Sequence, residues 1–468
     1  MKPAKFPKQI ALLAAILLLT FCAGQDEQTR PIVILGGTLL DGTGRAPLRD
    51  AAIVIQDGRF QQVGKRSEVS IPQGAEIINA EGKTILPGLI DGHCHYLDWA
   101  GELLLAFGVT TCPVVSGEKV EYMVAQREAT EKGEIRGPRL WFAGPTIDGP
   151  PPSYTSEARQ SRSDVVVKTP EEARKAVQEQ VAKGADGLKF YEYLTPELTQ
   201  AAADEAHRLG RPVIGHSLDI FVAAKAGFQS VEHFWAVVYT SAEDANRRTE
   251  LDIARNSGQT PTGEFHVHLE PDSFDSIIRA MVDNNVHWNP AWASRLRHLS
   301  PRAAVLKQQE LALLQDPRFS IPSLTAEGIE AVYSSLEKAT PQKRAELLEG
   351  YAKLEDFVRR FVAAGGKIHA GSDPHQGIPP AFPLHVELQL LVDAGLTPVQ
   401  AIQAASLNVA EAWQKDADYG SVEKGKVADL LVIRGNLMED MAATQNVESV
   451  FLDGKLVGGS SYVPVPSR

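Results

Sequence analysis

The chain has 468 residues, of which 43% are hydrophobic and 23% charged, and these proportions are typical of a globular protein with a large core in one or two domains. They exclude a disordered or fibrous chain. The formal net charge is -12, and no block of lysines and arginines could neutralise a phosphate backbone, so we expect no nucleic acid partner.

Residues 1–24 have the pattern of an export signal. Three lysines precede an apolar stretch at residues 10–21, which is short for a membrane span. The following Cys22 resembles the acylated cysteine of a bacterial lipoprotein, although Phe21 stands where a small residue is usual. We therefore expect an exported protein, periplasmic or anchored to a bacterial membrane, and lipidation of Cys22 stays open.

Both ends of the chain after this segment have a β pattern. Residues 31–85 hold short aliphatic runs broken by Gly-Gly and Asp-Gly turn signals, and residues 418–468 repeat this pattern. Two β-rich ends around a different middle predict one small β-sandwich domain formed by both termini.

Residues 86–417 alternate between strand and helix patterns. In the clearest unit, Thr169 caps a helix that begins with proline and ends at Gly184. Successive units of this kind predict the parallel sheet of an α/β protein, and a segment of this length favours a closed (β/α)8 TIM barrel. Two long segments near residues 239–285 and 294–364 interrupt the alternation, and we expect insertions that form lids or walls over one end of the barrel.

The first strand of this middle part runs into two histidines. In an extended strand alternate side chains share a face, so His93 and His95 are expected to point one way and Cys94 the other. Two imidazoles on one face can bind one metal ion. A disulfide between Cys94 and Cys112 is conceivable if their strands are neighbours, but two separate buried thiols are the favoured state.

Three later strand patterns end in Lys189, His216 and His233. A lysine ammonium has no lone pair, so Lys189 could bind a metal only after carbon dioxide converts it to a carbamate, whose two oxygens can bridge two ions. Asp373 ends a further apolar strand pattern at residues 366–373, and its carboxylate could bind a metal and accept a proton from water.

This order of ligands at strand ends resembles the amidohydrolase superfamily, in the branch of imidazolonepropionase-like enzymes and metal-dependent Xaa-Pro dipeptidases. The resemblance extends over nearly all of the chain after the export signal, including residues 85–91, 387–398 and 420–430. It implies two divalent metal ions, with zinc expected, and a hydroxide between them that attacks a carbonyl carbon while Asp373 handles the proton. The implied ligands of the first ion are His93, His95 and Asp373, those of the second are His216 and His233, and carboxylated Lys189 is the bridge.

The resemblance and the residues near these ligands suggest a substrate class. We expect hydrolysis of the amide (C-N) bond of a dipeptide or an N-acyl amino acid. Candidate residues for binding a substrate carboxylate are Tyr191, His375 and Arg295, and candidates for an apolar side-chain pocket are Trp235, Trp288 and Trp292.

Two other functions stay open at this point. One is an imidazolonepropionase-like cyclic-amide hydrolase or a deaminase. The superfamily's deaminases, however, carry a glutamate three residues after the histidine that corresponds to His216, and this chain has Asp219 there. The other is an exported binding protein without activity, which the six ligands disfavour. Assembly into a homo-oligomer also stays open. His266 and His268 repeat the His-x-His spacing inside the first insertion, but surface histidines are favoured there over a second metal site.

Overall fold

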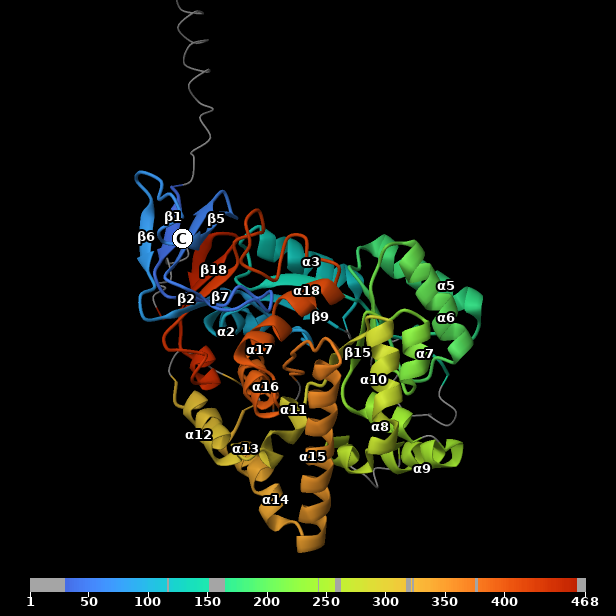
Figure 1. Ribbon diagram of the computed structural model, residues 1–468. Helices are drawn as coiled ribbons and strands as arrows, with labels where there is room; N and C mark the ends of the chain where they lie inside the picture. Colours follow the sequence, from blue (N-terminus) through green and yellow to red (C-terminus); the bar gives the residue numbers. More distant parts are fainter. Residues whose placement is uncertain are drawn as a thin grey trace, which may run out of the picture.

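The fold combines a β-rich part, built from both ends of the described chain, with a parallel β/α part between them. The computed structural model describes residues 30–115, 118–150, 165–242, 244–256, 262–316, 321, 324–374 and 378–460. The expected export signal at residues 1–24 lies outside the described residues. Figure 1 shows the blue N-terminal strands beside the red strand β18. Within the described ranges, no helix combines the length and the apolar character needed to cross a membrane.

The β-rich part contains two sheets that share a core. The first has the order β5-β4-β1-β6 and the second the order β19-β18-β17-β7-β2-β3. The central pair of the second sheet joins the two ends of the chain, because β7 (Thr84–Pro87) runs antiparallel to β17 (Leu430–Ile433). The core between the sheets holds buried aliphatic and aromatic side chains from both ends, among them Ile34, Ile53, Ile85, Leu430 and Phe451. The remaining strands are β1 (Ile32–Leu35), β2 (Thr38–Leu39), β3 (Leu48–Arg49), β4 (Ala51–Gln56), β5 (Arg59–Lys65), β6 (Glu76–Asn79), β18 (Val447–Leu452) and β19 (Lys455–Gly458).

Two Asp-Gly pairs form the hairpin turns that their sequence indicates. Asp57 and Gly58 join β4 to β5, Asp453 and Gly454 join β18 to β19, and all four residues have φ between 51° and 74°. Both central residues of such a two-residue turn need positive φ, which glycine adopts freely and aspartate tolerates.

The parallel part consists of two sheets rather than one closed barrel. One has the order β10-β9-β8 and the other the order β12-β11-β13-β14-β15-β16. At one junction, Asp186 N and Gly187 N both donate to the Phe142 carbonyl (2.9 and 3.4 Å). At the other, Gly92 N, which follows β8, donates to the carbonyl of Ala370 in the segment beside β16 (2.8 Å). The strands are β8 (Leu89–Ile90), β9 (Val109–Val114), β10 (Arg139–Phe142), β11 (Ile147–Asp148), β12 (Val165–Val166), β13 (Leu188–Phe190), β14 (Val213–Gly215), β15 (Ser230–Glu232) and β16 (His287–Asn289).

The last strand of the expected barrel does not form as a strand. Residues 366–373 make one isolated parallel bridge, between Ile368 and Trp288. The α/β class with parallel sheets therefore agrees with the sequence-based expectation, whereas a closed (β/α)8 barrel is not formed.

Helices connect successive parallel strands, and their ends follow the sequence signals. Thr169 accepts a hydrogen bond from Glu172 N at the start of α5 (Pro170–Lys183), and Thr195 accepts one from Leu198 N at the start of α6 (Pro196–Arg208). Gly184 ends α5 with φ of 111°. The other connecting helices are α2 (Gly101–Ala106), α3 (Val120–Glu131), α7 (Ile220–Lys225), α8 (Trp235–Ser241) and α10 (Phe274–Asp283). After the last parallel strand, α16 (Phe382–Asp393), α17 (Pro398–Ala404) and α18 (Leu407–Ala412) lead to β17.

The two long interrupting segments are largely helical. In Figure 1, α12 to α15 lie below the parallel part, and α15 extends downward from it. Phe357 and Phe361 of α15 contact the buried ring of Trp288. The helices of these segments are α9 (Ala245–Asn256), α11 (Ala293–Leu296), α12 (Ala303–Leu313), α13 (Ala326–Tyr333), α14 (Ser335–Lys338) and α15 (Pro341–Ala363).

Candidate metal centre

The structure brings six residues that the sequence singled out to one end of the parallel strands. His93 and His95 follow β8, His216 follows β14, His233 follows β15, and Lys189 lies within β13. Nitrogen and oxygen atoms of the four histidines and of Asp373 form two groups whose members lie within 4.8 Å of one another. One group is His93, His95 and Asp373, and the other is His93, His216 and His233. His93 thus belongs to both groups.

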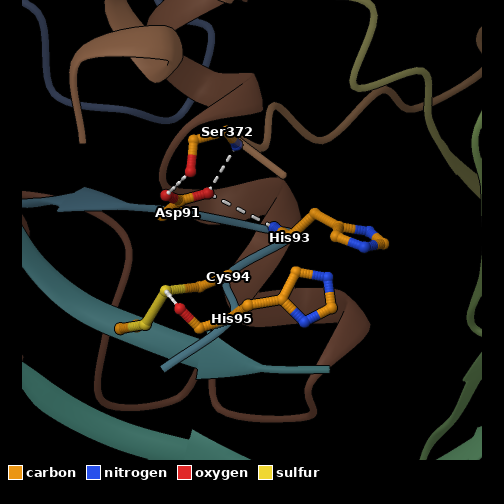
Figure 2. Close-up of a disulfide and its surroundings, with 6 residues drawn as sticks. Asp91, His93, Cys94, His95 and Ser372 are labelled. Carbon is orange, nitrogen blue, oxygen red and sulfur yellow. Dashed lines mark hydrogen bonds between the residues drawn. A yellow bond between two sulfur atoms is a disulfide. The ribbon is translucent and has the colours of Figure 1, made fainter. Parts of the chain in front are cut away.

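The His-x-His segment presents its side chains as expected although it is not a strand. Figure 2 shows the rings of His93 and His95 on one side of the backbone and the sulfur of Cys94 on the other. Asp373 N donates a hydrogen bond to the His93 carbonyl (2.9 Å), and the Asp373 carboxylate lies 3.4 Å from His95 Nε2. Gly371 permits this approach, because a Cβ atom there would lie 2.5 Å from His93 Cβ.

Glu232 holds His93 from behind, and this contact was not predicted. His93 Nδ1 donates to Glu232 Oε2 at 2.6 Å, and both residues are buried. The bond fixes the imidazole tautomer and leaves Nε2 facing Asp373 and free to bind a cation. The sequence does contain a signal for this contact, because the carboxylate of Glu232 directly precedes the predicted ligand His233.

A second histidine completes the surroundings of Glu232. Ser230 donates to Glu232 Oε1 at 2.6 Å, and His369 Nε2 lies 2.5 Å from the same hydroxyl. Because the hydroxyl proton is used on Glu232, His369 Nε2 must carry its own proton and donate. The hydrogen bonds from His369 and His93 overcome the effect of burial and hold the pKa of Glu232 well below its ordinary value, so this carboxylate is ionised.

Asp91 and Ser372 tie the two metal-site segments together. Ser372 donates to the Asp91 carboxylate from its backbone N at 2.7 Å and from its hydroxyl, as Figure 2 shows. Burial raises the pKa of Asp91 to about 6 despite these bonds. The contact therefore aligns residues 91–95 with residues 372–373.

The candidate ligands have the protonation states that metal binding needs. Burial lowers the pKa of His216 to about 3 and holds the pKa of His233 well below its ordinary value, so both imidazoles are neutral. Burial also lowers the pKa of Lys189 to about 8. Nearby imidazoles outweigh the effect of burial on Asp373 and hold its pKa well below the ordinary value, so it is ionised.

A divalent ion fits this set of residues. Among the described residues, Lys189 Nζ, His216 Nε2 and His233 Nδ1 are buried and have no hydrogen-bond partner. A buried polar atom without a hydrogen-bond partner costs free energy, so such atoms in native proteins usually have a partner. That partner can be a bound ion. Neutral imidazoles with a carboxylate are typical ligands of zinc and similar divalent metals.

Asn289 is a further residue that the sequence interpretation missed. It ends β16, is fully buried, and both polar atoms of its amide lack a hydrogen-bond partner within the described ranges. Its amide nitrogen lies against Gly371, on the same side as His93.

The predicted substrate residues fall into three groups. Tyr191 and Trp235 lie at the site, with ring centroids 4.5 Å from His216 and 4.0 Å from His233, and Arg295 lies 3.5 Å from the Asp373 carboxylate and over the Trp235 ring. Trp288 and Trp292 are instead core residues with 0% exposure, and Trp292 stacks on Tyr351. His375 lies outside the described residues.

Two minor expectations were wrong. Cys94 and Cys112 form a disulfide rather than two separate thiols, because adjacent parallel strands bring their Cα atoms to 5.8 Å. His266 is not a surface histidine, because it is fully buried and its Nε2 is bonded to the Leu347 carbonyl at 3.0 Å.

A parallel β/α framework with histidines, a lysine and a carboxylate at the strand ends defines a class of protein able to hold divalent ions in a buried site. The particular family follows from comparison with known proteins. The chain matches the Amidohydrolase family over residues 84–457 and belongs to it. The prediction of an amidohydrolase, an enzyme acting on C-N bonds, is thereby confirmed.

Individual relatives and solved structures agree with this assignment. The chain is similar to an imidazolonepropionase from Deinococcus deserti, with 26% identity over 413 residues that cover 86% of this chain and 90% of the relative. Its fold is similar to that of a Xaa-Pro dipeptidase with bound methionine in the active site (TM-score 0.63, 22% identity, 91% of this chain and 99% of that chain). It is also similar to that of the A. niger ochratoxinase (TM-score 0.64, 20% identity, 93% and 97%).

Proposed function

We propose that the chain is a binuclear metal hydrolase that cleaves the amide bond of a dipeptide or an N-acyl amino acid. The observation that carries this proposal is that two sets of candidate ligands meet at one site, with His93, His95 and Asp373 available for one ion and His216 and His233 for a neighbouring one. We propose zinc as the metal, because neutral imidazoles dominate the set.

Lys189 is the proposed bridge between the ions. Its buried amine, with a pKa lowered to about 8, is partly neutral near pH 7, and only the neutral amine can attack carbon dioxide. The nitrogen forms a bond to carbon and releases one proton, and the product is a carbamate with a negative charge. The carbamate oxygens would carry a negative charge, which suits a site of cations, and they would extend from the Nζ atom that has no hydrogen-bond partner among the described residues.

Asp373 is the proposed proton carrier. When bound, the two ions would supply Lewis-acid activation of a water molecule and of the substrate carbonyl. Asp373 is ionised and can accept the proton of that water at its carboxylate, and it can then return the proton to the leaving nitrogen. The Ser294 hydroxyl lies 3.3 Å from Asp373 Oδ2 and 2.9 Å from the Ala291 carbonyl, and its one proton is shared between these two acceptors.

Arg295 is the proposed contact for a carboxylate on the substrate. Its guanidinium lies over the Trp235 ring and beside Asp373, so it sits next to the proton carrier with one face on an apolar surface. Ions bound at Asp373 would compete with Arg295 for that carboxylate and leave the guanidinium available to an anionic group. Tyr191 lies across the site on His216, and His375 stays a proposal for the same role.

A cyclic-amide hydrolase is the second candidate. It is favoured by the similarity to imidazolonepropionases, which extends over most of both chains. An imidazolonepropionase-like activity would use the same ions and Asp373 but a ring amide as substrate.

Metal analysis and a substrate panel test both candidates. We expect two ions per chain after loading with zinc, and turnover of dipeptides or N-acyl amino acids with free carboxylates. Arg295→Ala should raise KM for the free acids by about tenfold or more, the loss expected for a hydrogen bond to a charged group, and leave their C-terminal amides unaffected. Fewer than two ions would refute the binuclear site, and turnover of imidazolone compounds alone would favour the second candidate.

We also propose that the protein is exported, as residues 1–24 suggest, and that it is periplasmic or membrane-anchored. The Cys94–Cys112 disulfide supports this compartment, because disulfides persist in oxidising environments and are rare in the cytosol. Mass spectrometry of the native N-terminus tests both cleavage and lipidation of Cys22, and an intact Met1 would refute export by a cleaved signal.

A further inference from the structure

A disulfide lies inside the candidate metal centre. Cys94 stands between the two ligands His93 and His95, and its sulfur is bonded to Cys112 of β9 on the opposite side of the backbone from the two rings (Figure 2). Cys94 and Cys112 are both buried, with 1% and 0% exposure. The crosslink is therefore attached to the residue whose placement sets both neighbouring ligands.

The backbone around Cys94 has left the regular strand pairing. The chain advances four residues from Ile90 to Cys94 while β9 advances three from Thr111 to Val114. This extra residue interrupts the ladder of hydrogen bonds, as in a β-bulge. The bond from Cys94 N to the Pro113 carbonyl is long, at 3.4 Å, and the next one, from Val115 N to the Cys94 carbonyl, measures 3.1 Å. The disulfide thus reinforces a place where backbone pairing is weak.

The two histidines depend on this tie to different degrees. His93 is fixed by its 2.6 Å bond to Glu232 and by the bond from Asp373 N to its carbonyl. The His95 side chain is 33% exposed, and among the described residues its ring makes a polar contact with Asp373 alone, at 3.4 Å. His95 is therefore the ligand whose position relies most on the backbone of Cys94.

We propose that the Cys94–Cys112 disulfide is a positioning device for His95. It sets the group His93, His95 and Asp373 for its ion, whereas His216 and His233, the candidate ligands of the other ion, do not need it. This inference rests on the proposed function, because it assumes that the two groups hold separate ions.

Zinc titration of metal-free protein against a competing chelator tests the inference. The variants are Cys94→Ala/Cys112→Ala and Cys94→Ala/Cys112→Val, in which valine fills more of the space. The control is Val114→Ala, which removes a buried side chain from the same apolar cluster and keeps the disulfide. Circular dichroism checks that each protein is folded.

We expect one of the two zinc dissociation constants to rise by about 10-fold to 100-fold in the double variants, the range seen when groups that orient a metal ligand are removed. The other constant, and both constants of Val114→Ala, should stay within threefold of wild type. Cobalt-loaded double variants should show a changed d-d absorption from one site. Unchanged constants in the double variants, or equal losses in them and in Val114→Ala, would overturn the inference while the proposed function stands. Wild-type protein that binds fewer than two ions would instead refute the proposed function.

A measurement on the wild-type protein covers the case in which neither double variant folds. If the disulfide tightens zinc binding, zinc must stabilise the disulfide to the same extent. We expect the equilibrium constant for reduction of the disulfide by a thiol–disulfide buffer, in which the buffer thiol is oxidised as the protein disulfide becomes two thiols, to be about tenfold smaller in zinc-loaded than in metal-free protein. Equal equilibrium constants would overturn the inference.

Discussion

Glu232→Gln is the most direct test of how the fold prepares His93 for metal binding. The substitution keeps the size of a fully buried side chain and removes the charge that accepts the 2.6 Å bond from His93 Nδ1. A hydrogen bond to a charged group contributes about 1.5 to 3 kcal/mol and a neutral one about 0.5 to 1.5 kcal/mol. The difference is about 1 to 1.5 kcal/mol, which corresponds to about a 5-fold to 13-fold loss of zinc affinity.

Glu387 offers a matched control for this change. It is a second fully buried carboxyl near the site, and burial raises its pKa well above the ordinary value. Glu387→Gln makes the same substitution at a side chain that makes no contact with His93 among the described residues, and the amide oxygen can still accept the 2.7 Å bond from Ala293 N. We expect zinc affinity within threefold of wild type.

The assay is zinc titration of both variants against a chromogenic chelator at pH 7, with thermal unfolding of the metal-free proteins as a check on folding. Wild-type affinity in Glu232→Gln would show that the charged bond does not prepare His93. An equal loss in Glu387→Gln would show that the effect comes from disturbance of the core rather than from charge.

Three further predictions concern other residues of the site. Lys189→Ala should lose bound zinc and activity together, and added acetate should restore part of both; elemental analysis and turnover decide this, and two ions with full rate would refute the carbamate. Asp373→Asn should retain at least one ion and lose about 10²-fold to 10⁴-fold in kcat, as expected for a proton-transfer group, and a near-normal rate with an unchanged pH profile would remove Asp373 from the mechanism. In the folded metal-free protein Asp91 keeps its proton up to about pH 6, whereas in the unfolded chain it loses the proton near pH 3.8. The proton therefore stabilises the folded state below pH 3.8, and as the pH rises through 6 the free energy of unfolding falls by about 3 kcal/mol. Asp91→Asn does not titrate, so urea unfolding should show its stability relative to wild type rising by about this amount from pH 4 to pH 7, and a constant difference would contradict the raised pKa.

Much of the site could be predicted because its signals are local. Strand ends with polar residues mark one edge of a parallel sheet, and His93, His95, His216, His233 and Asp373 do converge there. Helix starts at Thr169 and Thr195 follow from a threonine cap before proline, which depends on neighbouring residues alone.

Features that depend on residues far apart in the chain could not be derived in this way. Trp288 lies within β16 and Trp292 follows that strand, and the sequence alone does not show that α15 covers them with Phe357 and Tyr351. The disulfide could not be predicted with the sequence alone, because the prediction depends on how close the segment after β8 lies to β9. A closed barrel was expected from the alternation of elements, but residues 366–373 pair through one bridge only.

The backbone of His233 explains why Glu232 was missed. In a regular strand adjacent side chains point to opposite faces, so either Glu232 or His233 should reach the centre, but not both. His233 has φ of 66°, a conformation that is uncommon for residues other than glycine, and it leaves β15 at this point. Both side chains consequently reach His93, Glu232 by a hydrogen bond and His233 with its ring centroid 4.6 Å away.

The same holds for Ser372 and Asp373. Asp373 has φ of 44° and reaches the site, while its neighbour Ser372 donates a hydrogen bond to Asp91. Such conformations persist only where surrounding contacts hold them, and the bond from His233 N to the Asn289 carbonyl and that from Trp288 Nε1 to the His233 carbonyl do so here. The positive φ of His233 therefore breaks the alternation of side chains and places the candidate ligand His233 beside Glu232, the group that orients His93.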